Sequence, residues 1–405
     1  MINMFKYFSF QFLFKDSTLA VFYMLLLCMQ FVPIEGDSIS IVKVVCMALS
    51  PIAWLLKGGG INESFFWGVA YWLSCFICSL FQYGFRFATL VYLGLFIFTY
   101  ILFLFLLQKE SLNLNDFTNL LRVIIISYCV ILVLQQVCLL FGIRNFPLIN
   151  LCSQGFLDIA KLPSLSLEPS HTAIIISVSM LAYLRCVSMD VGYDISIKEL
   201  FRGTHRIVSL SYLWMIFTMG SGTGFVGLAI ISLFFIQRKT IIWTLPVIVG
   251  LFFLGRSLEI KQVNRVVNLL EIGIETKNIQ KMKDVEGSGA YRIIPLINTV
   301  LKMDYAKSDT WFGTGIQTRE HVFDGWKRTT DKLIIIEQYG LLSFLFSIML
   351  VYRCGIKKIL SIETLLFLVL FNFSLVNIYF VWGCFMIMSA VCFFQRKIER
   401  GMMNI

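Results

Sequence analysis

Apolar runs long enough to cross a lipid bilayer follow one another along most of this 405-residue chain. A membrane-spanning helix needs about 20 consecutive, mostly apolar residues. Hydrophobic residues make up 58% of the sequence and charged residues only 14%, which is more apolar surface than a soluble protein of this length can bury. The sequence therefore predicts an all-α integral membrane protein, folded as one polytopic domain over residues 1–405.

Twelve of these runs are predicted to be membrane spans. The three between residues 206 and 255 are short and closely joined, and a broken or re-entrant pair of helices would produce the same pattern there. The predicted spans are 17–34, 38–56, 65–84, 87–107, 121–142, 172–188, 206–220, 221–237, 240–255, 332–352, 359–376 and 378–394.

Basic residues are distributed unequally between the two sides that these spans define. With a cytoplasmic N-terminus, the short outer connections hold only three Lys and Arg residues, Arg86, Arg144 and Lys161, against seventeen on the cytoplasmic side. Short cytoplasmic loops carry an excess of Lys and Arg, so we expect both termini in the cytoplasm. The seventeen are Lys6, Lys15, Lys57, Lys109, Arg122, Arg185, Lys198, Arg202, Arg206, Arg238, Lys239, Arg353, Lys357, Lys358, Arg396, Lys397 and Arg400.

The net charge of +10 has the same origin. Lys and Arg are required on the cytoplasmic side simply to set the topology. No basic stripe with interleaved aromatic residues is present, so nucleic acid is not an expected partner.

A polar segment, residues 256–331, interrupts the apolar runs between the ninth and tenth spans. We expect it to be a large extracytoplasmic loop, because long loops cross the membrane largely regardless of their own charge. Apolar residues recur at helical spacing over residues 263–274, and a second helix is expected to begin just after Gly289. Residues 311–315 then predict a tight turn. This partly helical loop is where chemistry in water is most readily placed.

Arg292 falls in the first turn of the second predicted loop helix. The free N–H groups at a helix start and the bidentate guanidinium together suit a phosphate group. The alternative is a solvated charge on a surface helix. Arg256, directly after the ninth span, and Arg319 face the same compartment. Arg256 also has the position of a snorkelling anchor.

A second cluster, residues 167–171, stands just before the sixth span on the outer side. Burying polar groups at this depth in the membrane costs free energy, so such groups commonly have a function. Glu168 and His171 could deprotonate an attacking hydroxyl or bind sugar hydroxyls. Alternatively, the run is simply the start of the span, with Ser170 as its capping residue. The two interpretations are compatible.

His321 lies beyond the predicted turn, and it is either a lone loop histidine or a further candidate base. Gly313 and Gly315 form the predicted turn, and we expect both to contribute to binding the substrate. The chain holds no HExxH, Walker, GxGxxG or GxSxG motif. We therefore predict no metal site and no cofactor.

These features together resemble the Wzy-type O-antigen polymerase and ligase superfamily. The resemblance rests on about twelve spans, on Glu168, Pro169 and Ser170 at the outer side, on the Ser/Gly/Thr cluster at residues 220–224 between spans, and on the large outer loop. The order within the loop is also similar, since Arg292 stands some twenty residues before the Gly turn and the next span opens with residues 337–342. In the order of spans and loops, the resemblance covers nearly the whole chain. The sequence motifs that carry it are short.

The resemblance implies a glycosyltransferase of the bacterial inner membrane, embedded in the lipid bilayer. Its substrate would be oligosaccharide repeat units carried on undecaprenyl pyrophosphate, joined at the periplasmic face. A separate chain-length regulator is an implied partner. The implied residues are Arg292, Arg256 and Arg319 for the pyrophosphate, and Glu168, His171 or His321 for the acceptor hydroxyl.

Two alternatives remain beside the polymerase. The ligase branch usually carries a His-Asn-like pair shortly before its final Glu-x-Gly span, whereas residues 329–332 here read Thr-Thr-Asp-Lys, which favours the polymerase. A lipid-linked oligosaccharide flippase or other transporter belongs to a different class. Such proteins usually keep their loops short and place charges within spans, while these spans are poor in charge apart from Lys43.

Overall fold

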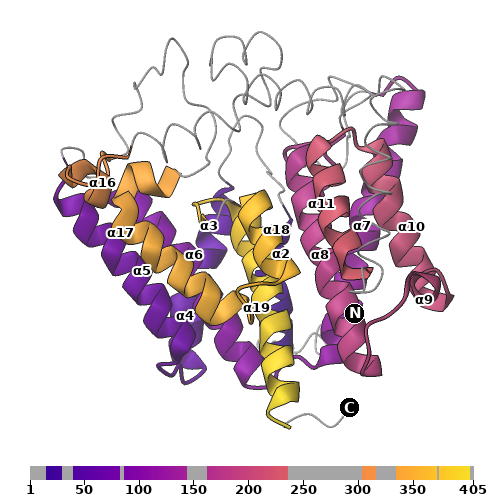
Figure 1. Ribbon diagram of the computed structural model, residues 1–405, viewed down its shortest axis with the longest axis horizontal. Helices are drawn as coiled ribbons and strands as arrows, with labels where there is room; N and C mark the ends of the chain where they lie inside the picture. Colours follow the sequence, from indigo (N-terminus) through magenta and orange to yellow (C-terminus); the bar gives the residue numbers. More distant parts are fainter. Residues whose placement is uncertain are drawn as a thin grey trace, which may run out of the picture.

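The described part of the chain is built from helices (Figure 1). The computed structural model describes residues 15–29, 40–82, 86–143, 162–235, 303–315, 334–371 and 374–401, and no residue within these ranges lies in a β-strand. The helices are α2 (Asp16–Cys28), α3 (Ile41–Ala48), α4 (Ser50–Leu56), α5 (Glu63–Leu80), α6 (Phe87–Gln108), α7 (Leu114–Leu140), α8 (Pro169–Val191), α9 (Ile197–Leu200), α10 (Gly203–Thr218), α11 (Gly222–Ser232), η2 (Leu233–Phe235), α16 (Ser308–Phe312), α17 (Ile334–Leu350), η3 (Val351–Gly355), α18 (Ile362–Phe371) and α19 (Tyr379–Glu399).

Six helices in the described ranges are long and apolar enough to cross a membrane. They are α5, α6, α7, α8, the continuous run of α17 and η3 (Ile335–Gly355), and α19. A helix satisfies its own backbone hydrogen bonds, which the interior of a bilayer requires. The prediction of a helical protein suited to a lipid bilayer is thereby confirmed.

These six helices correspond to the predicted spans 65–84, 87–107, 121–142, 172–188, 332–352 and 378–394. The shorter α10 occupies the predicted span 206–220. The predicted span 240–255 lies outside the described residues, as does the loop 256–331 apart from residues 303–315. Shorter apolar helices (Asp16–Cys28, Ile41–Leu56, Gly222–Phe235 and Ile362–Phe371) occupy the predicted spans 17–34, 38–56, 221–237 and 359–376.

Two of the predicted spans are not single straight helices. The run 38–56 breaks into α3 and α4 at Leu49, which ends one helix and begins the next, and Pro51 stands in the first turn of α4. Proline lacks the N–H that would continue the hydrogen-bond ladder. In α17 the backbone kinks at Gly340, whose φ of 79° is readily adopted only by glycine.

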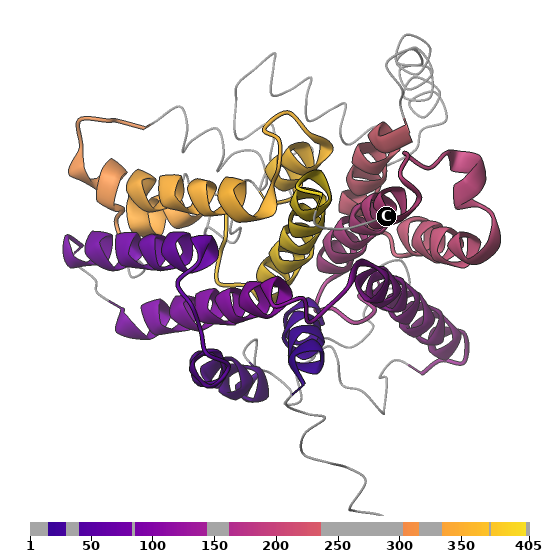
Figure 2. The ribbon, with the colours of Figure 1, turned by 90° about the horizontal axis from the view of Figure 1, so that it is seen from below.

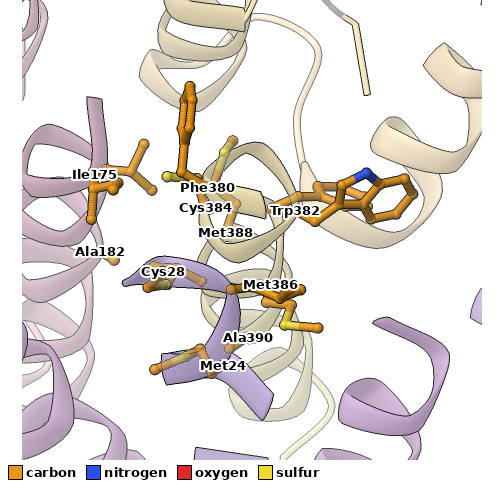
Figure 3. Packing of buried hydrophobic residues seen from close by; sticks show 14 of the residues in the cluster. Met24, Cys28, Ile175, Ala182, Phe380, Trp382, Cys384, Met386, Met388 and Ala390 are labelled. Atoms are coloured by element: carbon orange, nitrogen blue, oxygen red, sulfur yellow. The ribbon is translucent and has the colours of Figure 1, made fainter. Parts of the chain in front are cut away.

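Helix α19 is the centre of the packing (Figure 2). It contacts α2, α6, α8 and η3, and its residues from Tyr379 to Cys392 are all buried. Figure 3 shows Met24 and Cys28 of α2 and Ile175 of α8 facing its side chains. Gly383 makes the close approach to α2 possible, because a Cβ there would lie 2.7 Å from the backbone nitrogen of Cys28. Small residues allow helices in membranes to approach in this way.

Ion pairs gather at one end of the helices, which we call the basic end. There the starts of α2 and α5 meet the ends of α4, α6, η3 and α19. The pairs are Lys57 with Asp16 (2.6 Å), Lys397 with Glu110 (2.7 Å), Arg396 with Glu63 (3.8 Å), Arg353 with Glu63 (3.9 Å) and Lys357 with Glu399. The opposite end, which we call the site end, therefore holds the start of α19 and the end of α2.

Candidate functional site

The start of α8 brings the predicted residues Glu168, Ser170 and His171 together at the site end. Glu168 is the extended N-cap residue (φ −136°, ψ 150°) and Pro169 opens the helix. A residue before proline favours an extended backbone, and proline suits the first helical position, so the sequence itself dictates this start. The carbonyl of Glu168 accepts the first-turn hydrogen bonds from the N–H groups of His171 and Thr172.

The capping alternative for Ser170 needs correction. The N-cap position belongs to Glu168, two residues earlier, and Ser170 already lies within the helix. The Ser170 hydroxyl donates instead to the Glu168 carboxylate, with 3.0 Å between Oγ and Oε2. Proline at the first helical position moved the helix start upstream of the serine.

The carboxylate of Glu168 is shared between two neighbours. Its Oε2 lies 3.8 Å from His171 Nε2 as well as 3.0 Å from Ser170 Oγ. The Glu168 side chain is 58% exposed, while that of His171 is 22% exposed. The imidazole stacks on the ring of Phe380 in α19, with 4.4 Å between centroids and 30° between planes. An accessible carboxylate beside an oriented imidazole can accept a proton from a hydroxyl that reaches it.

The segment before Glu168 is anchored to α7. The backbone N–H of Ser164 donates to Gln135 Oε1 (2.9 Å), and Gln135 Nε2 donates back to the Ser164 carbonyl (3.1 Å). The Ser164 hydroxyl donates to the carbonyl of Tyr128 (2.5 Å). The Thr172 hydroxyl of α8 donates to the Pro163 carbonyl and so links the helix to the segment before it. These buried bonds set the direction in which the chain enters α8.

Lys43, at the start of α3, lies buried close to the start of α19, only 1% exposed. Its ammonium donates to the carbonyl of Met29 and lies 4.6 Å from the ring centre of Tyr379, the residue before Phe380. Lys43 was not among the predicted site residues. The signal that points to it is a charged residue within a predicted span, which is rare and commonly functional.

Gly313 and Gly315 lie elsewhere at this end, where α16 meets α17. Gly313 has a φ of 79°, and a Cβ there would lie 2.6 Å from the backbone nitrogen of Gly340. Gln82, just after α5, ties the corner by donating to the carbonyls of Phe312 and Gln338. Figures 1 and 2 show α16 and α8 on opposite sides of the helices. The Gly turn is thus packed against backbone and is not beside Glu168.

The remaining predicted site residues, Arg256, Arg292, Arg319 and His321, lie outside the described residues. Whether they approach Glu168 stays a prediction. Within the described ranges, no group of three His, Cys, Asp or Glu side chains is placed to hold a metal ion.

No protein-family model, curated protein or solved structure matches this chain.

Proposed function

We propose that this protein is a membrane glycosyltransferase that joins lipid-linked oligosaccharide repeat units, in the manner of the Wzy-type polymerases that its sequence resembles. The observation that carries the proposal is the exposed carboxylate of Glu168, held beside His171 at the end opposite the basic end. Since cytoplasmic loops are the basic ones, the site end is the extracytoplasmic end in this proposal. Lipid-linked repeat units are polymerised on that side.

The proposed chemistry needs few groups, because an isoprenoid pyrophosphate is a good leaving group. The acceptor hydroxyl attacks the anomeric carbon of the growing chain and loses its proton to Glu168. The bond between that carbon and the pyrophosphate oxygen breaks, and the pyrophosphate leaves with the bonding electrons. Cations stabilise the departing charge. In this proposal Arg292 binds the pyrophosphate with Arg256 or Arg319, and His171 or His321 orients the acceptor.

The same proposal includes the finer topology. Twelve spans place both termini in the cytoplasm and the loop 256–331 in the periplasm of a bacterial inner membrane. The substrate is a repeat unit on undecaprenyl pyrophosphate, and a chain-length regulator is the expected protein partner. The ion pairs that join the starts and ends of several helices at the basic end support one common cytoplasmic face.

Glu168→Gln tests the proposal in cells that make surface glycan. The amide keeps an oxygen for the Ser170 hydroxyl but cannot accept the proton of the acceptor. We expect surface glycans that carry a single repeat unit, with a loss of elongation of about 10²–10⁴-fold, the usual contribution of a general base. Glu110→Gln is the matched control, since it removes an exposed carboxylate at the basic end and should leave long chains.

Other glycan patterns would point to other functions. Repeat units trapped inside the cell, with no surface glycan, would favour a flippase. Long chains that remain on the lipid carrier would favour a ligase. Normal long surface chains in Glu168→Gln would exclude Glu168 as the base and contradict the proposal. Arg292→Ala should reproduce the single-unit pattern if that arginine binds the pyrophosphate.

A further inference from the structure

The end of α2 is joined to two other helices, α3 and α7, through two consecutive backbone carbonyls. The carbonyl groups at a helix C-terminus have no partner within the helix. The carbonyl of Cys28 accepts a hydrogen bond from the Tyr128 hydroxyl of α7 (2.8 Å), and that of Met29 accepts one from the Lys43 ammonium of α3. A cation at this position also complements the helix dipole. Side chains from two helices thus fix the end of α2.

One branch leads from this turn to Glu168. The Tyr128 hydroxyl that donates to Cys28 also accepts a hydrogen bond from the Ser166 hydroxyl (3.4 Å). The backbone carbonyl of the same tyrosine accepts the Ser164 hydroxyl. Ser164 and Ser166 are both fully buried, and Glu168 follows two residues later. Together with Gln135, Tyr128 therefore holds in place the segment that ends at Glu168.

The other branch leads to His171. The Lys43 ammonium lies over the ring of Tyr379, the first residue of α19. Tyr379 also packs edge-on against Phe96 of α6, with 5.3 Å between ring centroids. The next residue, Phe380, carries the ring on which the imidazole stacks. Lys43 thus holds the start of α19, which in turn supports His171 through the ring of Phe380.

We propose that Lys43 and Tyr128 are positioning residues of the Glu168/His171 pair, acting through the last turn of α2. Neither touches the carboxylate or the imidazole directly; each fixes the element that presents one of them. The inference deepens the proposed function and rests on it only for the effect on polymerisation. The structural coupling between Lys43 and His171 can be measured without any assay of activity.

The test is the NMR signal of the His171 ring in the full-length protein, purified in detergent with isotope-labelled histidine. The chain has three histidines, His171, His205 and His321. Stacking on Phe380 gives the His171 ring protons a ring-current shift, which Phe380→Leu removes and His171→Asn identifies. We expect Lys43→Met to move the His171 signal toward its position in Phe380→Leu. Tyr128→Phe should also shift the signal, through the displaced Glu168 carboxylate, whose Oε2 lies 3.8 Å from His171 Nε2. Lys43→Arg should restore much of the shift, because arginine keeps the charge and the hydrogen bond.

Lys109 offers a matched control at the basic end. Its ammonium also donates to a backbone carbonyl, that of Lys57, and lies 4.7 Å from the ring centre of Phe105. Lys109→Met therefore removes the same kinds of contact and should leave the His171 signal unchanged. An unchanged His205 signal reports that each variant is folded, since that ring lies against Tyr183 on the side of α8 near the basic end.

Polymerisation is the second readout. Lys43→Met should shorten surface glycans through a loss in elongation of roughly 10–10²-fold, because a displacement of about 1 Å can cost 10²-fold in a positioned reaction. An unchanged His171 signal in both Lys43→Met and Tyr128→Phe would overturn the inference, whatever the protein does. A shifted signal together with normal polymerisation in Glu168→Gln would instead remove the proposed function and leave the structural coupling in place.

Discussion

At the scale of single residues, Pro169 opens α8 beside the Glu168 carboxylate, and Gly383 lets α2 pack closely against α19. Ser170 was the expected cap of α8, but the helix begins two residues earlier, because Glu168 is extended before proline and Pro169 suits the first helical position. Gly383 could not be recognised in the same way, because nothing local marks it as a contact point. Its role depends on α2, which lies more than 350 residues earlier in the chain. This helix packs so closely against Gly383 that no side chain fits between them.

Gly383→Leu is expected to destabilise the protein. Any Cβ at this position would lie 2.7 Å from the nitrogen and 2.9 Å from the sulfur of Cys28, so α2 and α19 would have to separate. Overpacking of this kind usually costs about 1–3 kcal/mol. Thermal unfolding in detergent measures the effect.

Gly60→Ala is the corresponding control, since a Cβ there meets no atom within 4 Å. Its unfolding temperature should equal that of the original protein. Equal stability of Gly383→Leu and Gly60→Ala would show that α2 and α19 are not closely packed at Gly383.

At the scale of elements, hydropathy identified the long helices and missed their interruptions. Helices α5 to α8 and α19 follow from runs of apolar residues that match the thickness of a bilayer. The kink of α17 at Gly340 follows from a different cause. A Cβ on Gly340 would lie 2.0 Å from the carbonyl oxygen of Trp311. The kinked backbone at Gly340 therefore packs directly against the backbone of α16, which only a glycine permits. A hydropathy profile carries no information about such a contact.

The ion pair between α8 and α18 belongs to the same scale. The sequence assigned Arg185 only a topological role, but its Nε lies 2.6 Å from Glu363 Oε1 and its Nη2 lies 3.4 Å from Oε2. The two side chains are 23% and 14% exposed. The pair lines a small cavity together with apolar residues of α8, α18 and α19, among them Leu181, Leu366 and Met388.

Arg185→Met and Glu363→Met should each destabilise the protein, and the double variant should cost less than the sum. Arg185→Met leaves the partly buried Glu363 carboxylate without this partner, and Glu363→Met leaves the Arg185 guanidinium with the longer contact to Asp194 (4.0 Å), whereas the double change removes both charges. The coupling free energy is expected at about 0.5–3 kcal/mol, from unfolding of all four proteins in detergent. Strictly additive losses would mean that the ion pair does not hold α8 to α18.

At the scale of the whole molecule, the distribution of charge predicts orientation. Basic residues that are far apart in the sequence meet at one end of the helices, as a single cytoplasmic face would require. The site end then faces outward. The start of α8 and helix α16 lie at this same end but on opposite sides of the molecule (Figures 1 and 2).

Labelling with a membrane-impermeant maleimide tests this orientation. In a background whose native cysteines are replaced, Ser308→Cys in α16 should react from outside, because the residue is exposed at the site end. Gly60→Cys, exposed between α4 and α5 at the basic end, should react only after the membrane is opened. The reverse pattern would place the Glu168/His171 pair on the cytoplasmic side and contradict the proposed polymerase.

The amino-acid sequence alone was enough to predict the class of the fold, most of the long helices and a helix start within residues 167–171, although the N-cap proved to be Glu168 and not Ser170. Each of these depends on local composition, since bilayer thickness sets span length and proline sets a helix start. Only the tertiary structure placed Phe380 against His171 and joined Lys43 and Tyr128 to the end of α2. Their meeting depends on how helices far apart in the sequence pack around α19, through close contacts and buried hydrogen bonds that leave no periodic trace in the sequence.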